Sequence, residues 1–316
     1  MAGTSKNLTR REMVALGGSL SLGALAAVAF PAGISAAALP LLEVAYAGSM
    51  GSMMEGPLRT AVRRDLRLDM HGRAQGSNAL ARLISGGTIR PDIFISVTPG
   101  PMETVIRAGK ANAAEPIADT EMVIAYSRKG RFASKFEQAS MGHAQWWEIL
   151  QEPRLRFGRT DPSADPQGRN IIFTMMLAAK MYHQPDLARK ILGPAINPKQ
   201  IFSEPTVLAR LQSGELDASS AYKTQPGPFD VPYISLPREI NLSSQNVRTE
   251  NPDLMLTVDG KTYYPEPLIY YAAALTDALN PKGAAAFVQW LKGREAQSIL
   301  RAYQYGAPDG PSGLRA

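Results

Sequence analysis

The sequence lacks cysteine and is poor in histidine. Its 316 residues include no cysteine and three histidines. The lack of cysteine excludes disulfides, thiolate metal sites and a lipid-bearing cysteine. The histidines are too far apart in the sequence to predict a catalytic or metal cluster. We also find no HExxH, GxSxG or Walker motif, which are signatures of metalloproteases, α/β-hydrolases and nucleotide-hydrolysing proteins.

Blocks of positive charge are missing as well. The formal net charge is +6, but lysine and arginine are scattered along the chain and do not alternate with aromatic residues. Nucleic acid is therefore a poor candidate for a partner. A modest positive charge would instead suit a small anionic ligand.

The first 38 residues are typical of an export signal. They contain the sequence TRREM at residues 9–13, an apolar run at residues 14–30 and small residues at 35–38. This pattern predicts a cleaved signal peptide of the twin-arginine type over residues 1–38. An uncleaved membrane anchor is the alternative, but the run is short and rich in glycine, serine and alanine. Cleavage removes a net charge of +2 and leaves +4 on a periplasmic chain without a membrane anchor.

A polar loop followed by an apolar run marks the centre of the chain. Residues 157–169 read FGRTDPSADPQGR, and IIFTMMLAA follows directly. The two Asp-Pro pairs predict turns, and Gly168 would permit a close approach of another group. The apolar run predicts a helix that is buried on nearly all sides. A tight loop that begins a buried helix presents free backbone N–H groups, as an anion site does. A capped helix with no ligand is the alternative.

Strands and helices alternate in the first third of the chain. A predicted strand at residues 42–47 ends at Gly48-Ser49, and a predicted helix follows. A second loop, with Gly76-Ser77, also precedes a helix, and residues 92–96 form a third predicted strand. This alternation predicts a mostly parallel sheet whose ligands bind at the carboxyl ends of the strands.

Eight short motifs follow one another between residues 43 and 302. They are AGS at 47–49, GS at 76–77, PDIFIS at 91–96, MVIAY at 122–126, FGRTDP with DPQG at 157–168, SGELD with YK at 213–223, LPREINL at 236–242 and EPLIY at 266–270. In this order they resemble the tungstate/molybdate-binding proteins of ABC transporters, in the archaeal-type branch of the molybdate-binding family. The similarity covers nearly all of the chain that would remain after cleavage.

This resemblance implies an α/β fold, the two-lobed periplasmic binding protein of type II. Each lobe would be a mixed sheet flanked by helices, hinged about a central cleft. We expect lobe I to contain residues 39–127 and 266–316, and lobe II residues 128–265. The implied function is capture of a tetrahedral oxyanion, tungstate or molybdate, without a cofactor or catalysis. The implied partners are an ABC permease and its ATPase subunits, which are separate chains, and the binding protein would be a monomer.

The resemblance also implies a set of ligand-binding residues. These are Ser49, Ser77, Asp165, Gly168 and Tyr222. Positions that would support them are Gly48, Gly76, Asp161, Gln167 and Arg169. The same residue types also suit other roles, since the serines could cap helices, Asp165 could form a turn and Tyr222 could lie in the core. Either Asp161 or Asp165 could face the ligand.

The sequence departs from the family pattern at two positions. In the archaeal-type branch, a carboxylate of the Asp-Pro loop and a glutamate just before the tyrosine complete six oxygen ligands around the metal. Here the glutamate is replaced by Ala221, and the cysteine often found in the loop is replaced by Gln167. We therefore expect a four-coordinate anion, with Asp165 hydrogen-bonded within its own loop.

Three other functions compete with this interpretation. The ligand could be another oxyanion, such as sulfate, phosphate or arsenate. The tyrosine pairs Tyr263-Tyr264 and Tyr270-Tyr271 resemble those of ferric-binding proteins, which makes ferric iron a second alternative. An exported enzyme is the third, because the twin-arginine route carries many redox enzymes.

Overall fold

The structure is a computed structural model that describes residues 38–307 and 313–316. Residues 39–316 form one compact unit. The predicted signal peptide falls, except for Ala38, outside the described residues. Within the part of the chain that the structure describes, no helix has both the length and the apolar character needed to cross a membrane.

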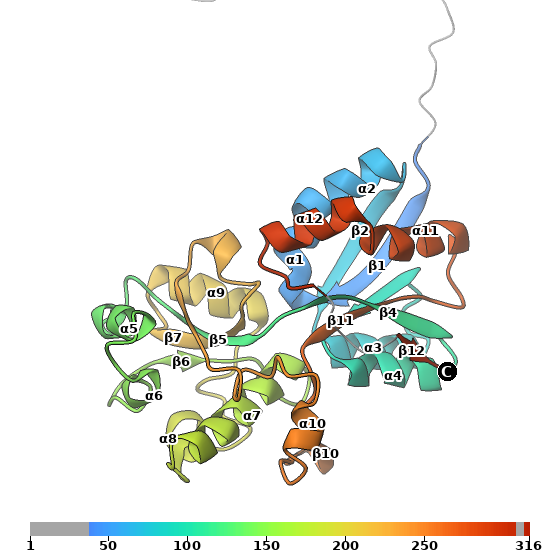
Figure 1. Ribbon diagram of the computed structural model, residues 1–316. Helices are drawn as coiled ribbons and strands as arrows, with labels where there is room; N and C mark the ends of the chain where they lie inside the picture. Colours follow the sequence, from blue (N-terminus) through green and yellow to red (C-terminus); the bar gives the residue numbers. More distant parts are fainter. Residues whose placement is uncertain (1–37, 308–312) are drawn as a thin grey trace, which may run out of the picture. The chain divides into compact units, whose positions relative to one another are not determined.

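A six-stranded mixed sheet forms the first half of this unit (Figure 1). Its strands, from edge to edge, are β12 (Leu314–Arg315), β4 (Ala113–Asp119), β11 (Ile269–Ala274), β3 (Ile93–Ser96), β1 (Leu41–Ala47) and β2 (Asp69–Gln75). β1 pairs in parallel with β2 and β3, as the sequence predicts. β11 comes from the C-terminal part of the chain and runs antiparallel between β3 and β4. The sheet is therefore mixed.

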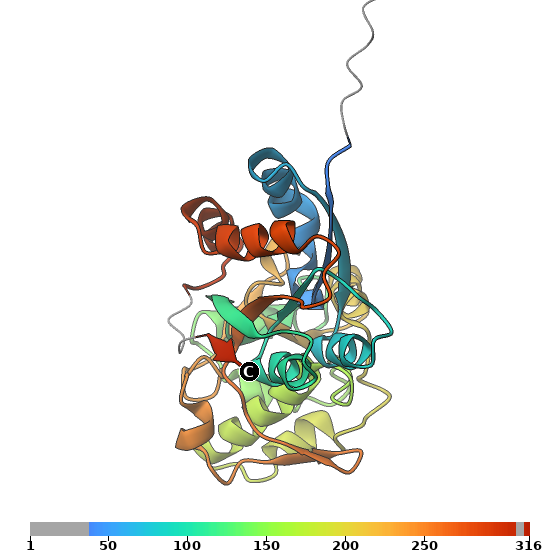
Figure 2. The same ribbon diagram turned by 90° about the vertical axis from the view of Figure 1, so that its right-hand side faces the viewer.

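Helices cover both faces of the six-stranded sheet. On one face are α1 (Gly51–Met53), α2 (Arg59–Asp65), α11 (Pro281–Leu291) and α12 (Arg294–Ala302). On the other face are α3 (Ser77–Ser85) and α4 (Pro99–Arg107). Figure 2 shows the red C-terminal helices and the teal helices α3 and α4 on opposite sides. The alternation of side chains along β1 explains this, since Val44 and Tyr46 pack on the first group and Ala45 on the second.

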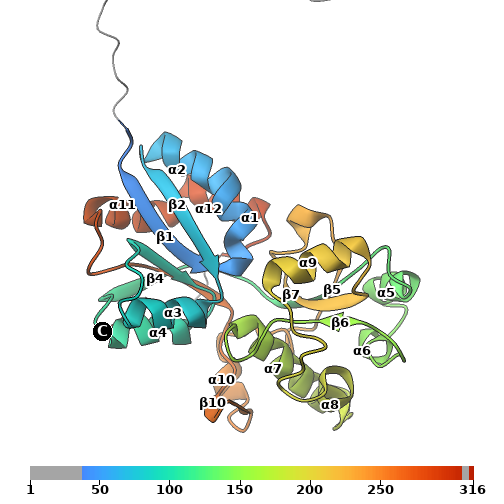
Figure 3. The same cartoon turned by 180° about the vertical axis from the view of Figure 1, so that it is seen from behind.

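A four-stranded sheet forms the second half (Figure 3). Its order is β6 (Phe157–Gly158), β7 (Ala218–Tyr222), β5 (Met122–Tyr126) and β8 (Tyr233–Ser235). The buried helix predicted from the apolar run is α7 (Pro166–Met181), which packs on one face, and α9 (Glu204–Ser213) packs on the other. The other elements are α5 (Ala133–Ser140), α6 (Trp146–Ile149), α8 (Leu187–Leu192), α10 (Val247–Glu250) and the hairpin of β9 (Leu256–Val258) and β10 (Lys261–Tyr263), together with the short helical turns η1 (Gly48–Met50), η2 (Met54–Leu58) and η3 (Gly227–Phe229).

Strand pairing corrects the expected boundary between the lobes. The expected lobe I extends from residue 39 to residue 127, but β5 pairs with β7 and β8 in the four-stranded sheet. The chain therefore passes from one sheet to the other between β4 and β5, at residues 120–121. The sequence does not indicate this, because the strands that pair with β5 come much later in the chain.

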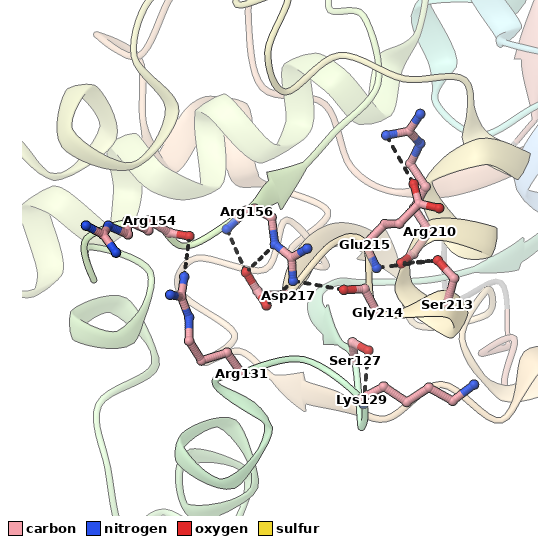
Figure 4. Close-up of polar contacts among 10 residues, drawn as sticks. All are labelled: Ser127, Lys129, Arg131, Arg154, Arg156, Arg210, Ser213, Gly214, Glu215 and Asp217. Carbon is pink, nitrogen blue, oxygen red and sulfur yellow. Dashed lines mark hydrogen bonds and ion pairs between the residues drawn. The ribbon is translucent and has the colours of Figure 1, made fainter.

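An ion pair holds three strands of the four-stranded sheet together (Figure 4). Arg156 precedes β6 and Asp217 precedes β7. One Asp217 carboxylate oxygen accepts from the Arg156 backbone N–H at 2.9 Å and from its Nε at 3.0 Å, and the other accepts from its terminal nitrogen at 2.8 Å. The Asp217 carbonyl also accepts from the backbone N–H of Ser127, which follows β5. Burial acts to raise the pKa of Asp217, but the Arg156 hydrogen bonds outweigh it and the pKa is lowered.

Candidate functional site

The N-termini of three helices converge on a cavity of about 420 Å³. α3 begins after Gly76, α7 after Asp165 and α9 after Ser203, and all three of these residues line the cavity. The first turn of a helix leaves backbone N–H groups without partners inside the helix, and the helix dipole makes that end positive. The arrangement can therefore bind an anion through backbone groups.

A smaller cavity of about 170 Å³ adjoins the first. The two cavities share the lining residues Gly48, Ala74, Glu204 and Pro205. Two glycines that directly follow strands β1 and β2 allow the second half of the unit to approach closely here. A Cβ at Gly48 would lie 2.0 Å from Glu204 Oε2, and one at Gly76 would lie 3.0 Å from the Ala164 carbonyl oxygen. Gly48 and Gly76 thus fit the cavity wall because they have no side chain.

Both aspartates of the polar loop line the larger cavity, and both also hold the loop together. Asp161 Oδ1 accepts from the Ser163 backbone N–H at 2.8 Å and from its hydroxyl at 2.7 Å. Asp165 caps α7, because its Oδ1 accepts from the Gln167 backbone N–H at 3.0 Å. The structural role of Asp165 therefore does not prevent its carboxyl group from facing the cavity.

The two predicted serines differ in their surroundings. Ser49 lines the smaller cavity, and its hydroxyl is 3.0 Å from the Tyr270 hydroxyl. Ser77 is 1% exposed and lies behind the wall, where its Oγ accepts from the Val97 backbone N–H at 3.4 Å. Gly76 occupies the N-cap position of α3, so Ser77 is the first residue of the helix.

Gly168 and Tyr222 lie behind the cavity wall. Gly168 packs against the backbone of residues 160–162. Tyr222 is buried, and its hydroxyl accepts from the Asn170 amide at 3.0 Å. Burial, followed by the negative charge of Asp165, raises the pKa of this hydroxyl well above its usual value. Tyr222 is therefore a neutral hydrogen-bonding group.

Gln167 and Arg169 point away from each other. Gln167 is buried and donates to Gln225 at 2.5 Å. The Arg169 guanidinium donates to the Pro162 carbonyl at 2.8 Å. It also donates to the Asn78 side-chain oxygen when the Asn78 amide is oriented with that oxygen toward the guanidinium. It also stacks over the Tyr263 ring at 4.2 Å and lines a third cavity of about 400 Å³. Arg169 thus connects α7 to α3 outside the two cavities described above.

One residue of the site is absent from our sequence-based prediction. Glu204, the first residue of α9, lines both adjoining cavities. Its Oε1 accepts from the Gln225 amide at 2.6 Å. Burial, followed by the nearby Asp165 carboxylate, raises the pKa of Glu204 well above its usual value. Burial also raises the pKa of Asp165, against the lowering effect of the Gln167 N–H. In the sequence, Glu204 resembles an ordinary acidic residue in the first turn of a helix.

The charged side chains that line the two cavities are all acidic. They are Asp161, Asp165 and Glu204, and no lysine or arginine of the described residues lines either cavity. Residues 38–307 and 313–316 contain no cluster of three or more His, Cys, Asp or Glu side chains that could hold a metal ion. An anion here would be bound by backbone N–H groups, hydroxyls and any carboxyl group that carries a proton.

Known proteins are similar to this chain in sequence. A protein from Haloferax volcanii, named as a candidate ABC transporter molybdenum-binding protein, is 28% identical over 87% of this chain and 85% of its own length. The molybdate/tungstate-binding protein WtpA of Pyrococcus abyssi is 29% identical over 58% of this chain. That match spans 59% of the relative, which is less than two thirds of its length.

The fold also matches solved structures. The periplasmic molybdate-binding protein of Azotobacter vinelandii has a TM-score of 0.59 and is 16% identical, with 85% of this chain and all of that chain covered. This likeness supports the two-lobed α/β architecture that the sequence predicts. The model of the bacterial extracellular solute-binding protein family matches residues 42–306. The chain therefore belongs to the bacterial extracellular solute-binding proteins.

Proposed function

We propose that this protein is the periplasmic receptor of an ABC importer and that it binds a tetrahedral oxyanion, with tungstate or molybdate as the expected ligand. The observation that carries the proposal is the convergence of the N-termini of α3, α7 and α9 on one cavity. The names of the Haloferax and Pyrococcus relatives support the choice of ligand. The partners would be the permease and ATPase subunits.

Binding and closure would be the whole mechanism. α3 belongs to the six-stranded sheet, whereas α7 and α9 belong to the four-stranded sheet, so one anion would contact both halves. A ligand shifts such an equilibrium only by its difference in affinity for the open and closed forms. Hydrogen bonds to a charged group contribute about 1.5–3 kcal/mol each. Those from the half that the anion does not meet first would form only when the two halves close. The permease would recognise the closed form.

A thermal-unfolding panel tests the proposal. We expect tungstate and molybdate to stabilise the protein more than sulfate, phosphate or arsenate. At a hundredfold excess over Kd, a ligand that binds only the folded state adds about 2.7 kcal/mol to the free energy of unfolding. If only phosphate, sulfate or arsenate stabilised the protein, that anion would replace tungstate and molybdate as the assigned ligand. No stabilisation by any of the five anions would contradict the proposal.

The serines provide a second test. We expect Ser49→Ala to weaken anion binding by about 1–3 kcal/mol, because the Ser49 hydroxyl lines a cavity and its loss removes a polar partner. We expect a smaller loss for Ser77→Ala, because the Ser77 hydroxyl lies behind the wall and acts only through the Val97 backbone N–H. Titration calorimetry with tungstate measures the loss. Ser85→Ala is a matched control, since Ser85 is at the opposite end of α3 from Ser77. Equal affinities for all variants would exclude the serines from the site.

Ferric iron is a second candidate because the cavities are lined by acidic side chains and no basic ones. The tyrosine pairs do not assemble into one site, however. The Tyr270 hydroxyl is 3.0 Å from the Ser49 hydroxyl, whereas Tyr271 packs on the opposite face of the sheet. Tyr263 and Tyr264 line the third cavity. Ferric citrate added to the protein would produce a visible tyrosinate absorption band if iron were bound by tyrosine.

A further inference from the structure

We propose that Glu204 is a ligand-contacting residue that presents a protonated carboxyl group to the bound oxyanion, with Asp165 as its acidic neighbour. This inference rests on the proposed function. It adds a residue from α9 to the site and predicts that binding takes up a proton.

The position of α9 brings Glu204 to the end of β7. Ala221 packs in one cluster with Val207 and Leu211 of α9, whereas Tyr222 faces the cluster on the other side of the sheet. Glu204 precedes Val207 by three residues, so both lie on the same side of the helix. The helix thus places a carboxyl group near the strand position where this chain has only a methyl group.

Gln225 fixes this carboxyl group in place. The Gln225 side-chain oxygen accepts from the backbone N–H of Tyr222 at 2.7 Å, and its amide nitrogen donates to Glu204 Oε1 at 2.6 Å. The other carboxyl oxygen, Oε2, points toward Gly48 and has no hydrogen-bond partner within residues 38–307 and 313–316. One oxygen is therefore bound to the protein, and the other is free to meet a ligand in the cavities.

The surrounding charges favour a proton on this free oxygen. The charged groups that face Glu204 are Asp165 at the start of α7 and Asp161 in the preceding loop, and both are acidic. The nearby Tyr305 hydroxyl is neutral, because burial keeps its pKa well above the usual value. Arg169 acts on Asp165 from outside the two cavities, which opposes but does not reverse the raised pKa of that group. A bound dianion would add more negative charge and so favour the protonated form of Glu204 further. In that form the carboxyl group can donate a hydrogen bond to the anion.

The proposal predicts a specific pH dependence. If binding takes one proton from solvent, the Kd for tungstate rises about tenfold per pH unit above the pKa of the free site. Glutamine at position 204 keeps a donor without a titrating proton. We therefore expect Glu204→Gln to bind tungstate at neutral pH and to lose most of this slope.

Titration calorimetry between about pH 6 and pH 9, a range in which an unperturbed carboxyl group stays ionised, tests this prediction. Runs in two buffers with different ionisation enthalpies give the number of protons taken up. Above the pKa of the free site, we expect the wild type to take up about one more proton than Glu204→Gln, and below it we expect the difference to disappear. Glu215→Gln is the control, since Glu215 lies just beyond the opposite end of α9 and should retain the wild-type slope.

The outcomes separate this inference from the proposed function. Wild-type binding with the same pH slope and proton uptake in Glu204→Gln would overturn only the role of Glu204. Loss of binding by the glutamine variant at every pH, together with six oxygen neighbours around tungsten in X-ray absorption, would replace proton donation by direct coordination. No binding of any oxyanion by the wild type would overturn both proposals.

Discussion

Gly168→Ala is expected to destabilise the protein by about 3 kcal/mol, the upper end of the usual range for inserting a methyl group into a packed site. The expected sign is opposite to that of helix propensity, which favours alanine over glycine by about 1 kcal/mol. A Cβ at this position would lie 2.4 Å from the Thr160 carbonyl oxygen and 2.7 Å from Pro162 N. These are backbone atoms, so a change of side-chain rotamer cannot relieve the overlap.

The loop of residues 160–165 cannot easily move away from α7, because hydrogen bonds fix its backbone at two points. The Asp165 backbone N–H donates to the Asp161 carbonyl at 2.8 Å, and Arg169 holds the Pro162 carbonyl. We therefore expect Gly168→Ala to displace both aspartates and to weaken tungstate binding along with stability. Chemical denaturation measures the first effect and calorimetry the second. Gly51→Ala is a matched control for stability, since a Cβ there meets nothing within 4 Å. Equal stability of the two variants would contradict the close packing at Gly168.

The second large effect is expected for Asp217→Asn. Removing one partner of a buried ion pair costs about 3–5 kcal/mol. We expect about 3 kcal/mol, the lower end of that range, because the Asp217 side chain is fully buried whereas that of Arg156 is 48% exposed. The substitution should destabilise the pairing of β5, β6 and β7 together, since the ion pair and the adjacent backbone hydrogen bonds join the ends of all three strands.

The same pair gives a pH dependence of definite sign. The folded-state pKa of Asp217 is lowered, so its contribution to stability is complete above the unfolded-state pKa of about 3.9. The contribution disappears as the pH falls through the folded-state pKa. The difference in free energy of unfolding between the wild type and Asp217→Asn should therefore be full at neutral pH and shrink towards zero at acid pH, as denaturation curves at both pH values would show. Glu215→Gln, which removes only the exposed pair with Arg210, should change stability by less than about 1 kcal/mol. A constant difference between wild type and Asp217→Asn down to the most acid pH would contradict this account.

The elements that could be predicted from the sequence are those with a mostly apolar run. β1 and α7 are of this kind, and the structure confirms them. β4 carries no such signal, because Pro116 lies in its middle. The structure accommodates this proline where the pairing of β4 with β11 shifts register, between Tyr270 and Tyr271. A proline that lacks an N–H donor is tolerated at such an irregularity, but only the partner strand reveals it.

The site could be predicted in part for a similar reason. The loops at Gly48, Gly76 and Asp165 each carry a local signature of glycine, serine or Asp-Pro, and the structure brings them to adjoining cavities. Glu204 has no such signature. Its approach to Gly48 depends on how α9 packs on β7, and its carboxyl group is oriented by Gln225, which lies in a different loop. Contacts of this kind come from tertiary packing and leave no pattern in the sequence.

The central place of β11 in the six-stranded sheet also sets the order in which the chain can fold. β11 is hydrogen-bonded to both β3 and β4, yet it is made after every strand of the four-stranded sheet. During synthesis β5, β6, β7 and β8 can therefore pair while β3 and β4 still have unpaired edges, which are prone to form wrong pairs. Completion of the larger sheet requires closure of a long loop, which slows folding. Residue 274, the last of β11, must be synthesised before β11 can pair with the free edges of β3 and β4.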